Sequence, residues 1–159
     1  MRILGIDIGK KRIGLAVSDE ESEIAFPAGT LASRGKKQDI RALCDLIKER
    51  EISRVVLGLP LHMDGRRGPE AEKAQAFGAA LSKAAGIPVD LLDERWTSSE
   101  AERLMRGTPK KKRALKRNQG TVDEMAASII LRTYLSQRAG AEAGSSTETR
   151  TPQQSESLK

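Results

Sequence analysis

Cysteine is almost absent from this chain of 159 residues, in which Cys44 is the single example. One thiol excludes an internal disulfide, and it excludes a zinc site built from several cysteines. Cys44 stands among Ile40, Leu43 and Ile47 at helical spacing. That spacing predicts a thiol packed in the core rather than a reactive one.

Aromatic residues and long apolar runs are also scarce. Phe, Trp and Tyr make up 3% of the chain, too few for base stacking to be a widespread mode of nucleic-acid binding. No apolar run is long enough to span a bilayer, and no signal peptide precedes the first strand pattern. We therefore expect a cytoplasmic protein without a membrane partner.

Acidic residues are outnumbered by basic ones, 22 against 28, which gives a net charge of +6. From Ala139 onward the sequence has no apolar period to offset the entropy of ordering, so we predict a disordered tail over residues 139–159. Removing the tail's two basic and three acidic residues leaves 26 minus 19, or +7, on residues 1–138. Such a surplus favours a polyanionic partner, and this length fits one domain.

The hydrophobic periods of residues 1–138 predict an α/β domain. Strands are expected at Arg2–Ile8, Ile13–Val17, about Ala28–Leu31, Arg54–Leu59 and Val89–Leu92, the last two buried on both faces. Helices are expected from about Ile40 to Arg50, from Pro69, from Thr97 to about Arg106 and from Thr121, the last two opened by capping boxes. The order βββαβαβαα implies a mixed five-stranded sheet with helices on both faces.

Three carboxylates stand where this fold would place a ligand. Asp7 interrupts the apolar first strand, and a buried carboxylate is costly unless it is paired or metal-bound. Gly5, Gly9 and Gly14 remove side chains around it, which we interpret as room for a bulky ligand. A strand-end turn aspartate is the alternative interpretation.

Glu94 follows a predicted parallel strand, at the end where α/β sheets bind ligands. A surface salt bridge with Arg95 is its alternative, and Asp93 competes for the role. Asp123 falls in the first turn of the last helix, where the helix dipole alone would favour an acid. Oxygen ligands without a histidine cluster suit Mg²⁺ or Mn²⁺. Two such ions can activate a water and stabilise the leaving oxygen of a phosphoryl displacement.

Four segments, in order, resemble the motifs of one family. Asp7–Asp19 resembles the opening signature of the YqgF/RuvX family of pre-16S rRNA nucleases, and Gly58–Gly65 resembles its second motif. Asp93–Ser98 is similar to the third motif, and Val122–Ala127 to the last. The resemblance extends over residues 1–138.

The resemblance implies a ribonuclease H-like fold related to Holliday-junction resolvases and a role in maturing the 5′ end of 16S rRNA. It implies that Asp7, Glu94 and Asp123 are the catalytic acids that bind Mg²⁺ or Mn²⁺. Resolvases of this fold carry an acid where the fourth strand ends, whereas this chain has Gly58-Leu59-Pro60 there. Glu94 takes its place, which favours the YqgF/RuvX family over the resolvases proper.

A basic segment lies between the second and third acids. It contains Arg106, Lys110, Lys111, Lys112, Arg113, Lys116 and Arg117 without an intervening acid. We interpret the segment from Lys110 to Arg117 as a clamp on the phosphate backbone, which would bind with little base specificity. Arg12 and Arg95 are expected to help position the phosphate. A solvated charge run is the alternative.

The expected function is therefore a Mg²⁺-dependent nuclease, endo- or exonucleolytic, that acts on pre-16S rRNA. A resolvase acting on DNA junctions and a non-catalytic RNA-binding or transcription-associated module remain alternatives. An ATPase related to sugar kinases, Hsp70 and actin is disfavoured, because such proteins need two domains and a second Asp-Gly phosphate loop. The oligomeric state, monomer or weak dimer, stays open.

Overall fold

The computed structural model describes residues 1–60, 65–93 and 119–148, with side chains described up to Ala141 and, within the last helix, from Asp123. The strands are β1 (Arg2–Ile8), β2 (Arg12–Ser18), β3 (Ala25–Ala32), β4 (Ile52–Leu59) and β5 (Val89–Asp93). The helices are α1 (Lys36–Glu49), α2 (Pro69–Ala85) and α5 (Gln119–Glu148). The helix expected from Thr97 to Arg106 lies outside the described residues.

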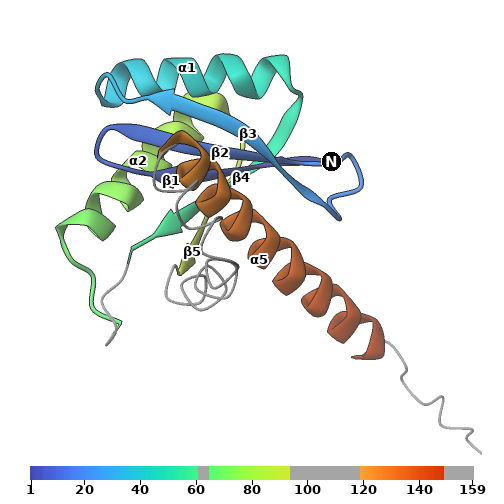
Figure 1. The fold of residues 1–159 in the computed structure, drawn as a ribbon. Helices are drawn as coiled ribbons and strands as arrows, with labels where there is room; N and C mark the ends of the chain where they lie inside the picture. Colours follow the sequence, from blue (N-terminus) through green and yellow to red (C-terminus); the bar gives the residue numbers. More distant parts are fainter. Residues whose placement is uncertain (61–64, 94–118, 149–159) are drawn as a thin grey trace, which may run out of the picture.

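The five strands form one mixed sheet in the order β3-β2-β1-β4-β5 (Figure 1). β2 is antiparallel to both β1 and β3, whereas β1, β4 and β5 run parallel. The β1–β2 connection is a hairpin in which the amide of Gly9 donates to the carbonyl of Arg12 at 2.9 Å. The predicted mixed five-stranded sheet is therefore confirmed.

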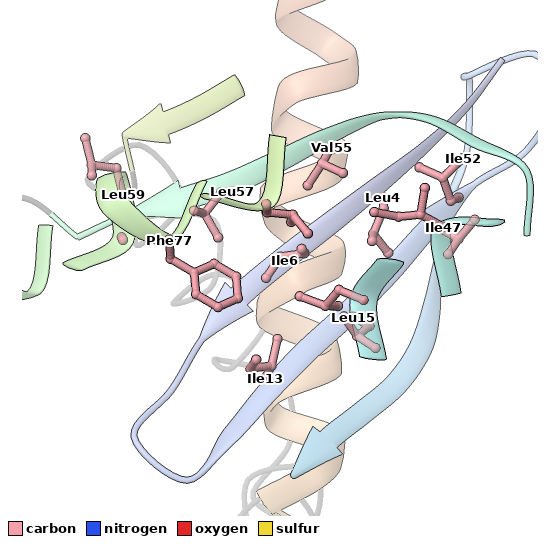
Figure 2. Close-up of a cluster of buried hydrophobic side chains, with 14 of the residues drawn as sticks. Leu4, Ile6, Ile13, Leu15, Ile47, Ile52, Val55, Leu57, Leu59 and Phe77 are labelled. Atoms are coloured by element: carbon pink, nitrogen blue, oxygen red, sulfur yellow. The ribbon is translucent and has the colours of Figure 1, made fainter. Parts of the chain in front are cut away.

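Helices cover both faces of the sheet, and strand alternation sorts the side chains between them. Leu4 and Ile6 of β1 pack in a core with α1 and α2, shown from within in Figure 2. Ile3 packs instead in a second core with Ala127, Leu131 and other residues of α5. Odd-numbered residues of β1 thus face α5, and even-numbered residues face α1 and α2.

Several local predictions agree with the structure. Pro69 is the first residue of α2, after an extended Gly68 at the N-cap, because its fixed φ and missing N–H suit that position. Val55 to Leu59 are buried, as expected for a strand covered on both faces. Cys44 packs against the core with α1 and α2 and forms no disulfide.

Two predictions about strands and caps are wrong. β5 is the edge strand of the described sheet and is only partly buried, with Leu91 38% exposed. Its apolar run resembles that of a central strand because one face packs on α2 and the other on α5. The last helix begins at Gln119, so Thr121 lies inside its first turn and is not its N-cap.

The structure continues α5 to Glu148, so residues 139–148 are helical where the sequence predicted disorder. Residues 149–159 lie outside the described residues, and the disordered tail stays a prediction there. The three alanines and Glu142 of residues 139–143 favour helix, whereas the glycines, serines and threonine of residues 139–148 do not. The side chains of Ala139, Gly140 and Ala141 are exposed. Leu135, 6% exposed, is the last buried residue of the described chain, so a packed domain ending near Arg138 stays a prediction.

Among the helices in the described ranges, none has the length and apolar character that crossing a membrane requires.

Candidate metal and nucleic-acid site

Asp7 lies near the carboxyl end of β1, the central strand of the sheet. It shares the odd-numbered face of β1 with Ile3, which packs against α5, and its side chain is half-buried. Its partner across the antiparallel ladder is Gly14 of β2. The missing side chain of Gly14 therefore opens the surface directly beside the Asp7 carboxylate.

Helix α5 fills that opening with its first turns. A Cβ atom added to Gly14 would lie 2.1 Å from the carbonyl oxygen of Asp123 and 3.1 Å from its Cβ atom. Directly paired residues of an antiparallel ladder have Cβ atoms roughly 5 Å apart. The Cβ atoms of Asp7 and Asp123 are then no more than roughly 9 Å apart. The fold brings these two predicted site residues together.

The interpretation of the glycines around Asp7 is wrong. A Cβ atom on Gly5 would lie 2.8 Å from the Cβ atom of Leu131, and one on Gly9 would lie 2.7 Å from the carbonyl oxygen of Arg12. Gly5 and Gly14 admit α5 to the sheet, and Gly9 closes the hairpin. Helix and turn, and not a ligand, occupy the space that these glycines leave.

Asp93, the competitor of Glu94, lies on the other face of the sheet. It pairs in register with Leu59, which belongs to the core with α1 and α2. Its neighbour Leu92 packs instead in the core with α5. Asp93 is therefore separated by the sheet from Asp7 and Asp123. Glu94 itself lies outside the described residues.

Within the described ranges, one group of acids has the spacing of a metal site, and it is a different group. Asp19, Glu21 and Glu23 place carboxylate oxygens within 4.8 Å of one another, in the β2–β3 connection at the opposite end of the sheet from the β1–β2 hairpin. Asp19 Oδ1 accepts the backbone amides of Glu23 at 2.7 Å and Ile24 at 3.0 Å. These hydrogen bonds within the β2–β3 connection identify the carboxylate as part of a turn, and the one from Ile24 lowers the pKa of the Asp19 carboxyl.

The sequence did not reveal a polar cluster that fastens the middle of α5 to the sheet. Arg54 donates to Asp90 Oδ2 at 2.7 Å, and the Tyr134 hydroxyl donates to the same oxygen. Burial would raise the pKa of the Asp90 carboxyl, but hydrogen bonds from Tyr134 and Arg54 outweigh burial and lower it. A carboxylate inside an apolar strand, the signal that singled out Asp7, was also present at Asp90.

The structure describes one of the predicted nucleic-acid contacts, Arg12. Arg12 begins β2 at the hairpin and is exposed, beside the equally exposed Lys10 and Lys11. The remaining predicted contacts lie outside the described residues: Arg95, Lys110, Lys111, Lys112, Arg113, Lys116 and Arg117. The clamp therefore stays a prediction.

A family model described as "RuvX: Holliday junction resolvase" matches residues 1–137. The chain belongs to the RuvX family. A relative from Anaeromyxobacter dehalogenans (strain 2CP-C), named "Putative pre-16S rRNA nuclease", is 43% identical over 139 residues, which cover 87% of this chain and 99% of the relative. A relative of the same name from Chloroflexus aurantiacus (strain ATCC 29366 / DSM 635 / J-10-fl) is 44% identical over 136 residues, 86% of this chain and 87% of the relative.

Solved structures similar to this RuvX-family chain agree on the fold. RuvC of T. thermophilus in complex with a Holliday junction substrate has a TM-score of 0.56 at 15% identity, covering 88% of this chain and 96% of that one. The Fowlpox virus resolvase in complex with Holliday junction DNA has a TM-score of 0.51 at 15% identity, covering 86% and 98%. The expected ribonuclease H-like fold is confirmed.

Proposed function

We propose that this chain is a divalent-metal-dependent nuclease that hydrolyses phosphodiester bonds of pre-16S rRNA during maturation of its 5′ end. The observation that carries the proposal is the meeting of Asp7 and Asp123 across Gly14. The meeting point lies near the carboxyl end of β1, at the edge where parallel strands of α/β folds place their ligands. Membership of a family whose members are named as nucleases supports the reaction class.

The donor atoms available at this point suit a hard cation. Asp7 and Asp123 offer carboxylate oxygens alone, which Mg²⁺ and Mn²⁺ prefer over the nitrogen and sulfur ligands of zinc. Both side chains are half-buried, so their orientation is restricted while solvent still has access. Together with Glu94 they would hold the metal. A bound divalent cation supplies charge stabilisation for the phosphoryl group under attack and acidifies the attacking water.

Strand alternation argues against Asp93 as the third acid. In β5, Leu92 faces α5 and Asp93 pairs with a residue of the opposite core. Asp93 therefore lies on the side of the sheet away from Asp7 and Asp123, and the third motif leaves Glu94 as the candidate for the third acid. The proposal assigns Asp7, Glu94 and Asp123 to the metal site and leaves Asp93 out of it.

The relatives favour RNA as the substrate. Relatives at 43% and 44% identity, of which this chain covers 99% and 87%, carry the pre-16S rRNA name. Such a substrate would place the protein in the bacterial cytoplasm. Cleavage of four-way DNA junctions is the second candidate function, since the family model is described as a Holliday junction resolvase.

One comparison of substrates tests the proposal. Pure protein is incubated with a pre-16S 5′ leader RNA and, separately, with a four-way DNA junction, each with Mg²⁺ and with a chelator. We expect Mg²⁺-dependent cleavage of the RNA and little cleavage of the junction. Preferential cutting of the junction would support the second candidate, and absence of cleavage in both would refute the nuclease proposal.

A further inference from the structure

The hairpin end of the sheet carries a group of basic side chains that are far apart in the sequence. The group, called the hairpin patch below, consists of Lys10, Lys11, Arg12, Arg34, Lys36 and Lys37. All six side chains are exposed. The Lys11 carbonyl accepts the amide of Ser33 at 2.9 Å, and Arg12 pairs with Ala32. The fold thereby joins residues 10–12 to the start of α1 at one end of the molecule (Figure 1).

Few acidic side chains accompany this basic group in the described structure. None of the six basic residues takes part in an ion pair there. The nearest acid in sequence, Asp39, is 4% exposed. Its two carboxylate oxygens accept hydrogen bonds from the Ser33 hydroxyl at 2.7 Å and from the Arg34 backbone amide at 2.9 Å. Asp39 therefore holds the β3–α1 connection and forms no ion pair with the patch in the described structure.

The stability of α1 does not explain two of these charges. Lys36 and Lys37 occupy the first turn of α1, which begins after Gly35 without a side-chain cap. The first turn is the positive end of the helix dipole, where cations are unfavourable. Residues that oppose the helix they belong to are better explained by a partner of negative charge.

The hairpin patch borders the proposed site. Arg12 is two residues from Gly14 along β2, a distance of roughly 7 Å, and Gly14 is the ladder partner of Asp7. β3 and β5 are the two edges of the described sheet, and the patch lies on the β3 side of Asp7. Glu94 and the predicted clamp follow β5 in the sequence.

We propose that the hairpin patch binds the phosphate backbone of the nucleic acid on the β3 side of Asp7. The proposal rests on the proposed nuclease function, which supplies the polyanion. Lysine and arginine contacts to phosphates carry no base preference, and their number sets how steeply the affinity falls with salt. The patch would extend the bound backbone beyond the bond that is cut.

Binding measured in a chelator tests the patch without cleavage. In the patch variant, Lys10, Lys11, Lys36 and Lys37 of the full chain are replaced by Gln. In a matched control, four exposed basic residues elsewhere are replaced by Gln: Lys48, Arg50, Lys83 and Arg132. Both variants lose the same charge, so a difference between them reports position and not net charge.

The probes are the pre-16S 5′ leader RNA and the four-way DNA junction, each titrated over a range of salt concentrations. We expect two of the four replaced lysines to contact phosphates. Loss of two contacts lowers the slope of log affinity against log salt by about 1.4 to 1.8 and weakens binding roughly 25- to 60-fold at 0.1 M salt. We expect this in the patch variant on the probe that the chain cleaves. In the control variant, the slope should change by less than the value of about 0.7 that corresponds to one phosphate contact. The melting temperature of the patch variant should be unchanged or higher.

An unchanged salt slope in the patch variant, or an equal loss in the control, would overturn the patch proposal. Wild-type protein that binds RNA through the patch yet cleaves nothing with Mg²⁺ would refute the nuclease proposal and leave the patch standing. Wild-type protein that binds neither probe would overturn both.

Discussion

The two faces of the sheet are built in different ways. Toward α1 and α2, the sheet presents large branched side chains such as Leu4, Ile6 and Leu57 (Figure 2). Toward α5, it presents Gly5, Gly14 and Ala16 next to the larger Ile3, Val56 and Leu92, and α5 contributes Ala127 in return. The first face stabilises the domain by burying apolar area. The second lets a helix backbone approach the strands closely.

This difference explains why the candidate site lies on the α5 face. In the middle of the first face, where Leu4 and Ile6 lie, a carboxylate would be buried under leucine and isoleucine side chains. On the second, the close approach of α5 brings Asp123 beside Gly14 and Asp7 while both carboxylates remain half-buried. The helix that closes the core is thus also the element that brings Asp123 to the candidate site.

The largest expected effect comes from removing the carboxylate charge at the centre of the α5 face. Asp7→Asn should lower the rate of Mg²⁺-dependent cleavage by about 10³-fold or more, since groups that act as one unit each remove most of the activity. The fold should stay intact. Asp45→Asn, an exposed carboxylate on α1, is the matched control and should retain wild-type turnover. A folded Asp7→Asn protein with normal turnover would refute the site.

The second test compares acids on the two faces. Asp123→Asn and Glu94→Gln should each abolish most cleavage, and the double variant should lose barely more than either single one. Asp93→Asn should retain most activity, because Asp93 lies on the face of α1 and α2. Multiplicative losses in the double variant, or an inactive Asp93→Asn, would show that the acids do not share one site.

Glycines on the two faces should respond differently to an added methyl group. Gly14→Ala places a Cβ atom against the backbone of Asp123, so we expect a loss of about 1–3 kcal/mol in the free energy of unfolding together with lower activity. Gly78→Ala meets side-chain atoms of Leu57 and Val89 at 3.3 and 3.4 Å. Those ends can move, and alanine favours helix, so its stability should stay within about 1 kcal/mol. Urea denaturation measures the free energy of unfolding of both variants. Equal losses in the two would contradict the expected difference between the faces.

A smaller effect is expected where α5 leaves the proposed site. Tyr134→Phe removes a hydrogen bond to the Asp90 carboxylate and should cost about 0.5–1.5 kcal/mol near neutral pH. Because hydrogen bonds lower the pKa of Asp90 in the folded protein, their contribution is present above the unfolded value of about 3.9 and is lost as the pH falls through the folded value. Chemical denaturation of wild type and variant should therefore converge only when the pH falls below the folded pKa of Asp90, which lies below the ordinary value. A difference that persists in acid would contradict this assignment.

The smallest effect should follow removal of the chain after Arg138. Residues 139–141 are exposed, so we expect the melting temperature and the cleavage rate to stay nearly unchanged. Removal of the chain after Tyr134 is the contrasting variant, because it deletes Leu135, which is buried in the core with α5. This second variant should be clearly destabilised. Equal melting temperatures for the two truncations would show that the packed domain ends elsewhere.

Much of the fold could be predicted because its signals are local. β1 is confirmed at Arg2–Ile8, since an apolar β-branched run bounded by Gly9 has one interpretation. α2 begins at Pro69 as predicted, since proline suits the first position of a helix. Burial of β5 could not be predicted, because an apolar run does not reveal whether a further strand pairs beyond it. The Asp90–Tyr134 contact joins residues 44 positions apart, and no local period encodes it.

The sequence by itself determined the strand and helix periods, the order of the motifs and the choice of Asp7, Glu94 and Asp123 as candidate acids. Only the tertiary structure decided what the glycines are for and which acids share a face. In the sequence, Gly14 is a glycine within an apolar run and has no evident role. In the structure, α5 packs on Gly14, the ladder partner of Asp7, and so brings Asp123 close to Asp7. Asp93 and Glu94 are equivalent neighbours until the pleat of β5 assigns Asp93 to the face away from Asp7. The hydrophobic period of a segment shows whether it is a helix or a strand. Which residues meet on one face of the sheet depends on how the whole chain packs.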